Sequence, residues 1–184
     1  DLSILENCVR EELDLTAPRA MAILDPLKVV IENFPEDHIE QIEVPNHPKN
    51  EEYGRRKITI SKEIYIDRSD FMEDPPKKFY RLSLGKEVRL RYAFVITCKH
   101  IVKDTNGEIS ELRCEYNPKT YNGQNPEGRK VKGIIHWVSR HDSTPLEIRL
   151  FDRLFEVPSP GSENDFRKVI NPNSLEIKKE SLGE

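Results

Sequence analysis

The sequence predicts an all-β fold that is preceded by one short α-helix. After about residue 20, the 184-residue chain is a series of short segments rich in β-branched and aromatic residues, separated by turn signals. Thirteen prolines against eight glycines favour short elements joined by rigid turns. A series of some ten short strands is typical of β-barrels or of a β-sandwich.

The predicted helix covers residues 3–14. Its apolar residues recur at helical spacing, at Ile4, Leu5, Cys8, Val9 and Leu13. Pro18 disfavours further helix beyond about Ala17. Because the chain begins at Asp1 without a methionine and enters this helix directly, we expect it to be part of a longer protein.

Strands follow the helix along the rest of the chain. The predicted strands are residues 21–32, with a bend at Asp25 and Pro26, then 39–44, 57–60, 64–66, 77–84, 87–98, 101–103, 109–116, 130–138, 146–151 and 175–178. Gly85 and Lys86 are the predicted hairpin turn between residues 77–84 and 87–98. Residues 104–107 (DTNG) carry a strong turn signal before residues 109–116.

The loops at residues 67–76 and 157–163 are the predicted boundaries between two units. The strand spacing places a smaller barrel at about residues 77–156. It would lie between the two halves of another barrel, residues 19–76 and 157–184.

The most informative local feature is a basic window at residues 77–91 (KKFYRLSLGKEVRLR). It carries six basic residues and one acid, a net charge of +5 in a chain whose total is −4, so the remainder sums to −9. In a regular strand Glu87, Arg89 and Arg91 would share one face, opposite Val88, Leu90 and Tyr92. This pattern indicates a site for a polyanion, with RNA as the first candidate; an ordinary charged barrel surface is the alternative.

Residues 128–133 (GRKVKG) form a second basic segment before an apolar strand. The segment is either a contact for backbone phosphate or a charged hairpin. In the strand that follows, we expect Trp137 in the core and His136 in a structural role.

The other motifs point away from catalysis and metal binding. Walker A, GxGxxG and GxSxG motifs are missing, and Asp67, Asp70 and Asp74 are expected to cap turns instead of holding a metal. The cysteines are three, widely spaced and without a CxxC pair, so we expect neither a disulfide framework nor a zinc site. With no apolar run near about 18 residues and no secretory signal, we expect no membrane partner and a cytoplasmic location.

Six strings of the sequence resemble, in the same order, the C-terminal anticodon-binding region of glutaminyl-tRNA synthetase, a class I aminoacyl-tRNA synthetase. They are APRAMAILDPLKVVIEN, VPNHP, IYIDRSDF, YRLSLGKEVRLRYAFVI, GRKVKGIIHWVS and PLEIRLFDRLF, and the resemblance covers about residues 3–178. It implies two β-barrels, the distal one inserted in the proximal one. Residues 1–18 would be the end of a helical linker from a catalytic domain. Since relatives continue past Glu184, the proximal barrel is expected to be incomplete.

The resemblance also implies RNA-binding residues, one set for each base of a splayed anticodon. Arg19 would contact the central uridine. Arg81 would read the third base with Tyr80 and Lys78 beside it, and Arg89 with Arg91 would form the pocket for the first base. Two residues near the loop complete the set, Lys49 and Asn50. Tyr80 and Tyr92 depart from the family, in which a basic residue and an asparagine are common at these positions.

The implied function is recognition of the anticodon loop of tRNA(Gln) by a monomer. The parent enzyme would be a glutamine–tRNA ligase that uses ATP in the catalytic domain. This chain would hold no cofactor and no catalytic residue, and would be inactive alone. Three alternatives stay open: a eukaryotic or archaeal glutamyl-tRNA synthetase, a free-standing RNA-binding β-barrel, and a β-module that binds other proteins.

Overall fold

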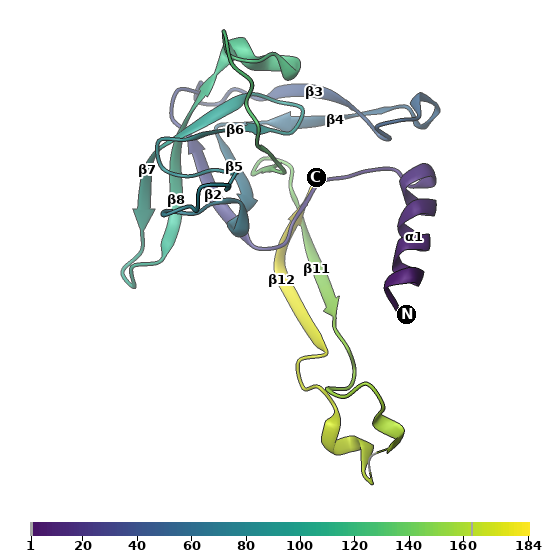
Figure 1. Cartoon of the computed structure of the whole chain (residues 1–184). Helices are drawn as coiled ribbons and strands as arrows, with labels where there is room; N and C mark the ends of the chain where they lie inside the picture. Colours follow the sequence, from purple (N-terminus) through teal and green to yellow (C-terminus); the bar gives the residue numbers. More distant parts are fainter. Residues whose placement is uncertain (1, 163) are drawn as a thin grey trace.

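The computed structural model describes residues 2–162 and 164–184 (Figure 1). The all-β fold with an N-terminal helix is confirmed. The elements are α1 (Leu2–Thr16), β1 (Ala22–Ile23), β2 (Pro26–Ile31), β3 (Glu40–Pro45), η1 (Glu51–Tyr53), β4 (Arg55–Ile60), β5 (Glu63–Asp67), η2 (Arg68–Asp70), β6 (Glu87–Leu90), β7 (Val95–Lys103), β8 (Ile109–Asn117), η3 (Pro118–Gly123), β9 (Ile134–Ile135), β10 (Val138–Ser139), β11 (Thr144–Phe151), η4 (Pro160–Ser162), η5 (Phe166–Val169) and β12 (Leu175–Gly183).

The helix α1 stands beside the strands (Figure 1), and its C-terminal end contacts residues 47–53, between β3 and β4. It is slightly longer than predicted, and its apolar residues Ile4, Leu5 and Val9 are exposed. The end of the helix is fixed by Tyr53, whose hydroxyl donates to the carbonyl oxygen of Thr16 at 2.7 Å. Among the described residues, no helix is long and apolar enough to cross a bilayer.

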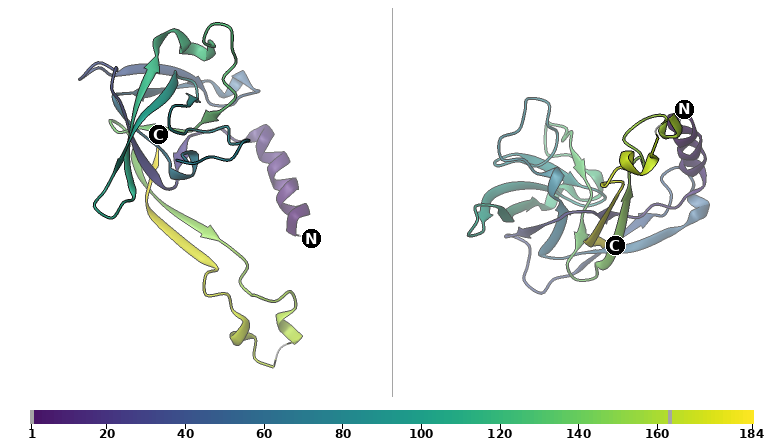
Figure 2. Two further views of the ribbon diagram at one scale, coloured as in Figure 1. Left: turned by 60° about the vertical axis from the view of Figure 1, so that its left-hand side comes forward. Right: turned by 90° about the horizontal axis from the view of Figure 1, so that it is seen from below.

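A seven-stranded sheet in the order β10-β5-β2-β8-β7-β6-β9 forms the body and curls around the core (Figure 2). The pairs β2–β8 and β6–β9 are parallel, and the other neighbours are antiparallel. The hairpin β3–β4 adds Ile42, Val44, Ile58 and Ile60 to the same core. Trp137 is 1% exposed within this core, as predicted.

This sheet draws strands from both sides of the predicted boundary at residues 76 and 77. The strands β2 and β5 lie before it and β6 to β10 after it. The division of the chain into a proximal barrel (19–76 and 157–184) and a distal barrel (77–156) stays a prediction.

The strands β11 and β12 form a long hairpin that projects from the body (Figure 1). Both predicted strands are confirmed, and both are longer than their apolar patterns indicated. The strand β1 pairs with the end of β12, with Ala22 opposite Gly183. The hairpin is thereby tied to the segment that follows α1.

A turn is present at Gly85, where φ is 70° and the amide of Lys86 donates to the carbonyl oxygen of Ser83 at 3.0 Å, but it joins no two strands, so the predicted hairpin is wrong. Residues 77–84 form no strand; an isolated bridge joins Leu84 to Cys98 of the sheet, and another joins Leu82 to Phe71 after η2. The hairpin turn lies instead between β6 and β7, where hydrogen bonds between Leu90 and residues 93 and 94 reverse the chain. At its tip Tyr92 has a φ of 67°, which is uncommon for a bulky residue.

The predicted turn at residues 104–107 forms, whereas most of the predicted strand at residues 130–138 does not. The turn at residues 104–107 is confirmed, with the Asp104 carboxylate accepting from the amides of Asn106 and Glu108 at 2.8 and 3.0 Å. Of the predicted strand at residues 130–138, only the short β9 and β10 form. Residues 128–133 are an irregular loop.

Candidate nucleic-acid interface

A basic cleft of about 660 Å³ lies between residues 75–87 and the loop 128–133. Its charged lining residues are one acidic residue, Glu87, and six basic residues: Lys77, Arg81, Lys86, Arg129, Lys130 and Lys132. Because the cations outnumber the acid so strongly, the basic cleft suits a polyanion.

The loop 128–133 is held against residues 79–81 by close backbone contact. A Cβ atom at Gly133 would lie 1.9 Å from the carbonyl oxygen of Tyr80, so only glycine fits at this position. The carbonyl oxygen of Gly133 accepts from the amide of Arg89 at 3.0 Å, and Arg129 forms an ion pair with Glu87. These contacts set the distance between the two walls of the basic cleft.

Tyr80 projects from one wall of the basic cleft and Lys132 from the other. The Tyr80 side chain is about half exposed, and the Lys132 ammonium lies 5.2 Å from the centroid of its ring. Such a cation–π contact orients the ring without burying it. An exposed aromatic ring among cations is the arrangement on which an unpaired base stacks.

Arg81 is an exposed member of the basic cleft, and two oxygens of η2 fix its position. Its Nη1 lies 3.2 Å from the Asp70 carboxylate and 3.2 Å from the carbonyl oxygen of Ser69. Burial raises the pKa of Asp70, and the Arg81 charge opposes that shift. Lys78, on the same segment, is exposed but does not line the cleft.

Asp67 confirms the predicted capping role. Its carboxylate accepts from the amide of Ser69 at 3.0 Å at the start of η2. The hydrogen bonds it receives outweigh its burial and lower its pKa. Within the described residues, no group of three or more His, Cys, Asp or Glu side chains could hold a metal ion.

Arg89 and Arg91 differ in accessibility, and their sharing of one face stays a prediction. The strand β6 ends at Leu90, and Arg91 already belongs to the turn. The Arg89 side chain is 7% exposed, and its guanidinium donates to the carbonyl oxygens of Thr120 at 2.9 Å and Gln124 at 2.5 Å. Burial lowers the pKa of Arg89. These contacts do not favour Arg89 as a group that reaches a base.

Arg91 is half-buried and therefore more accessible than Arg89. Its guanidinium carbon lies 5.2 Å from the centroid of the Tyr92 ring. The carbonyl oxygen of Arg91 accepts from the indole of Trp137 at 2.9 Å. This bond anchors the turn to the core while the side chain remains at the surface.

The structure brings Arg19 and Lys49 together on the carboxylate of Asp14. The distances are 2.8 Å from Arg19 Nη2 and 2.5 Å from Lys49 Nζ, and Lys49 followed by Arg19 lowers the pKa of Asp14. The amide of Lys49 donates to Nδ1 of the buried His47, whose Nε2 therefore donates to the carbonyl oxygen of Asp14 at 3.0 Å. Asn50 caps η1 by accepting from the amide of Glu52.

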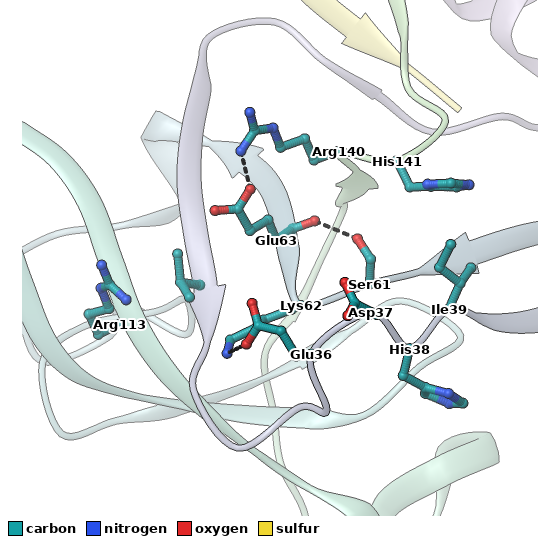
Figure 3. Close-up of a pocket in the computed structure, with 11 residues that line it drawn as sticks. Glu36, Asp37, His38, Ile39, Ser61, Lys62, Glu63, Arg113, Arg140 and His141 are labelled. Atoms are coloured by element: carbon teal, nitrogen blue, oxygen red, sulfur yellow. Dashed lines mark hydrogen bonds and ion pairs between the residues drawn. The ribbon is translucent and has the colours of Figure 1, made fainter.

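A second hollow of about 600 Å³ lies between residues 36–39, 61–63 and 140–141 (Figure 3). Four of its charged residues are paired with each other: Lys62 with Glu36, and Arg140 with Glu63. The hydrogen bond from Lys28, and then that from Arg140, lowers the pKa of Glu63. Such internal pairing makes this hollow a weaker candidate than the basic cleft for a polyanion.

The sequence interpretation did not place the loop 128–133 in the site. The composition of this loop does indicate a site for a polyanion, because three basic residues lie between two glycines. Its position opposite Tyr80 could not be inferred, since about fifty residues separate the two segments.

Comparison with known proteins supports an RNA-binding role. Two family models described as anticodon-binding domains of class I (E and Q) tRNA synthetases match residues 17–117 and 134–184. The glutamine–tRNA ligase of Bradyrhizobium diazoefficiens is 54% identical over 177 residues, 96% of this chain and 32% of the relative. That of Haemophilus influenzae is 54% identical over 179 residues, 97% of this chain and 32% of the relative.

The glutamine–tRNA ligase of Salmonella newport is 51% identical over 179 residues, 97% of this chain and 32% of the relative. The chain therefore spans about a third of the length of these curated relatives. Residues 118–133, which include one wall of the basic cleft, lie between the two matched segments. On the first match alone, which covers more than half of its residues, the chain belongs to the family of anticodon-binding domains of class I (E and Q) tRNA synthetases.

Proposed function

We propose that this chain is the anticodon-binding region of a glutamine–tRNA ligase and that it binds the anticodon loop of tRNA(Gln). The family match and relatives named as glutamine–tRNA ligases support the assignment. The single observation that carries it is the basic cleft, which presents the exposed side chains of Arg81, Tyr80 and Lys132 together. The family model also includes enzymes for glutamate, but the named relatives favour glutamine.

In this proposal, the basic cleft takes one unstacked base of the anticodon loop. Proteins read single-stranded RNA by stacking bases on aromatic rings and bonding their edges. Tyr80 supplies the ring, and the guanidinium of Arg81 supplies a planar set of donors. Within the described residues, the Arg81 guanidinium contacts Asp70 and Ser69 through Nη1, so its other nitrogens are the ones that would meet the base. Lys130 and Lys132 would hold the backbone phosphates.

A second contact would come from the pair Arg19 and Lys49. Asp14 binds both side chains and so orients them before RNA arrives. The resemblance assigns Arg19 to the central uridine, and the shared carboxylate places Lys49 beside it. Asn50 would act through η1, which its side chain caps.

For the first base of the anticodon, we propose different roles for Arg91 and Arg89. Arg91 keeps its proposed contact with the first base, since its side chain is accessible. For Arg89 we propose a positioning role instead, because its guanidinium fastens residues 120–124 to β6. This anchoring would shape the surface beside the basic cleft.

We also propose that the complete ligase joins glutamine to tRNA with ATP in a part outside this chain. The chain alone would then be inactive and would require no cofactor. It would act as a monomer in the cytoplasm. Assay of glutamine transfer by the chain with ATP and tRNA(Gln) tests the first point; any turnover would contradict it.

Filter binding with Arg81→Ala tests the proposed function. We expect affinity for tRNA(Gln) to fall by about 1–3 kcal/mol, with a smaller loss for non-cognate tRNA, because Arg81 would bond a base edge. Arg113→Ala is the matched control, since this half-buried arginine of β8 lines the second hollow and its substitution removes the same charge. An equal loss for every tRNA would reduce Arg81 to a phosphate contact, and an unchanged affinity would remove it from the site.

A further inference from the structure

Cys98 and Cys114 face each other across two neighbouring strands of the sheet. Cys98 lies on β7 and Cys114 on β8, and the two residues are direct antiparallel partners. Both side chains are 0% exposed, and both are free thiols. Neither takes part in the proposed RNA contacts.

The backbone hydrogen bonds show which kind of antiparallel pair this is. The amide of Cys98 donates to the carbonyl oxygen of Lys86 at 3.2 Å, and its own carbonyl accepts from Gly85 at 2.9 Å. The carbonyl oxygen of Cys114 accepts from the amide of Glu32 at 2.8 Å. These groups point away from the facing strand, so the two cysteines form a non-hydrogen-bonded pair.

In such a pair the Cα atoms lie about 4.5 Å apart and the side chains approach more closely than at hydrogen-bonded positions. A disulfide spans Cα distances from about 4.4 to 6.8 Å. The typical Cα separation of such a pair therefore falls at the lower end of the range that an S–S bond spans.

The two thiols also differ in acidity. The hydrogen bond between them lowers the pKa of Cys98. The same bond, with burial, raises the pKa of Cys114. Cys98 is therefore the sulfur that loses its proton first, and the thiolate is the reactive form.

We propose that Cys98 and Cys114 are a redox pair, which closes to a reversible cross-strand disulfide when the folded chain meets a small disulfide oxidant such as oxidised glutathione. The Cys98 thiolate attacks one glutathione sulfur, forms a mixed disulfide and releases one glutathione thiolate. Deprotonated Cys114 then attacks Sγ of Cys98 and releases the second glutathione. Two protein thiols are oxidised, one glutathione disulfide is reduced to two thiols, and these take up the two protons.

The two thiols lie in the hydrophobic core, and β7 becomes exposed at the residue after Cys98. His100, two residues after Cys98, is exposed, and a register shift separates these residues. Opening of the β7–β8 hairpin from this point admits the oxidant, so oxidation is slow and follows local unfolding. The backbone of Cys98 also holds Gly85 and Lys86, which line the basic cleft.

The test uses the chain with Cys8→Ser, because Cys8 is exposed and would form disulfides between molecules. The protein is equilibrated in buffers of reduced and oxidised glutathione, once folded and once in concentrated urea. Acid quenching, alkylation of free thiols and peptide mass spectrometry then give the fraction of Cys98–Cys114 disulfide. The readout needs no RNA, so its result does not depend on the proposed function.

We expect the equilibrium constant for disulfide formation to be at least about tenfold larger in the folded chain than in urea, since the sheet raises the effective concentration of one thiol at the other. Added dithiothreitol should restore both thiols. An equal or smaller constant in the folded chain, or only glutathione adducts on single cysteines, would overturn the proposal. Cys8→Ser with Cys114→Ala is the control that must yield no intramolecular disulfide.

Discussion

Three arginines of the basic window show how one residue type takes different roles at different depths. Arg81 is exposed and held by Asp70, whereas Arg91 is half-buried against Tyr92. Arg89 is buried among carbonyl oxygens. A buried guanidinium is tolerated only where its donors are bonded, so the contacts of Arg89 stabilise the fold.

Arg89→Met should therefore act on stability. It leaves the carbonyl oxygens of Thr120 and Gln124 without their donor, and we expect the free energy of unfolding to fall by about 3 kcal/mol. Urea denaturation measures this change. Arg91→Ala is the comparison, and at its half-exposed position we expect a change within about 0.5 kcal/mol. A stable Arg89→Met protein that loses affinity for tRNA(Gln) would instead support a direct contact between Arg89 and the first base.

At the scale of elements, the basic cleft depends on how a loop packs against an irregular segment. Residues 77–84 are not a strand, and β9 covers only part of its predicted range. The contact of Gly133 with Tyr80 replaces the hydrogen-bonded ladder that two strands would have formed. The position of Lys132 over the Tyr80 ring follows from this contact.

Gly133→Ala should disturb both walls of the basic cleft. The added methyl group would lie 1.9 Å from a backbone oxygen that cannot rotate away, so the loop must shift. We expect a loss of about 2 kcal/mol in stability and weaker binding of tRNA(Gln). Urea denaturation and filter binding measure the two effects.

The control for this substitution is Gly161→Ala. A Cβ atom at Gly161 would have no neighbour within 4 Å, so both quantities should remain unchanged. A Gly133→Ala protein with normal stability and affinity would mean that the contact does not hold the loop in place.

At the scale of the whole molecule, charge is separated between the basic cleft and the rest of the surface. The chain has a net charge of −4, yet six basic residues and one acidic residue line the cleft. Negative charge elsewhere repels a polyanion, so binding is concentrated at the few basic sites. RNA affinity of such a protein falls with added salt, because bound phosphates release counterions.

The joint substitution of Lys130 and Lys132 by alanine should reduce this salt dependence. If each lysine neutralises one phosphate, the slope of log K against log salt falls in magnitude by about 1.4. Filter binding of tRNA(Gln) over a range of salt concentrations measures the slope. Alanine at Lys99 and Lys103, exposed lysines of β7, makes the same charge change and should leave the slope intact. Equal slopes in all three proteins would contradict a phosphate contact at the loop 128–133.

Sequence patterns predicted most of the elements because those patterns act locally. The helix, the turn at residues 104–107 and most strands follow from residue spacing and turn chemistry over a few positions. Side-chain alternation did not predict the burial of Arg89, and the reason is physical. Alternation puts a residue in solvent only where one face of the strand is exposed, but Val88, Arg89 and Leu90 of β6 are all buried.

The all-β class, the basic window and the collinear family motifs follow from the amino-acid sequence alone. Tertiary structure decided which cations act together: the loop 128–133 lies opposite Tyr80, Lys49 joins Arg19 on Asp14, and Arg89 is withdrawn into the protein. It also paired Cys98 with Cys114. These outcomes depend on contacts between residues far apart in the chain, and spacing along the sequence carries no record of such distances.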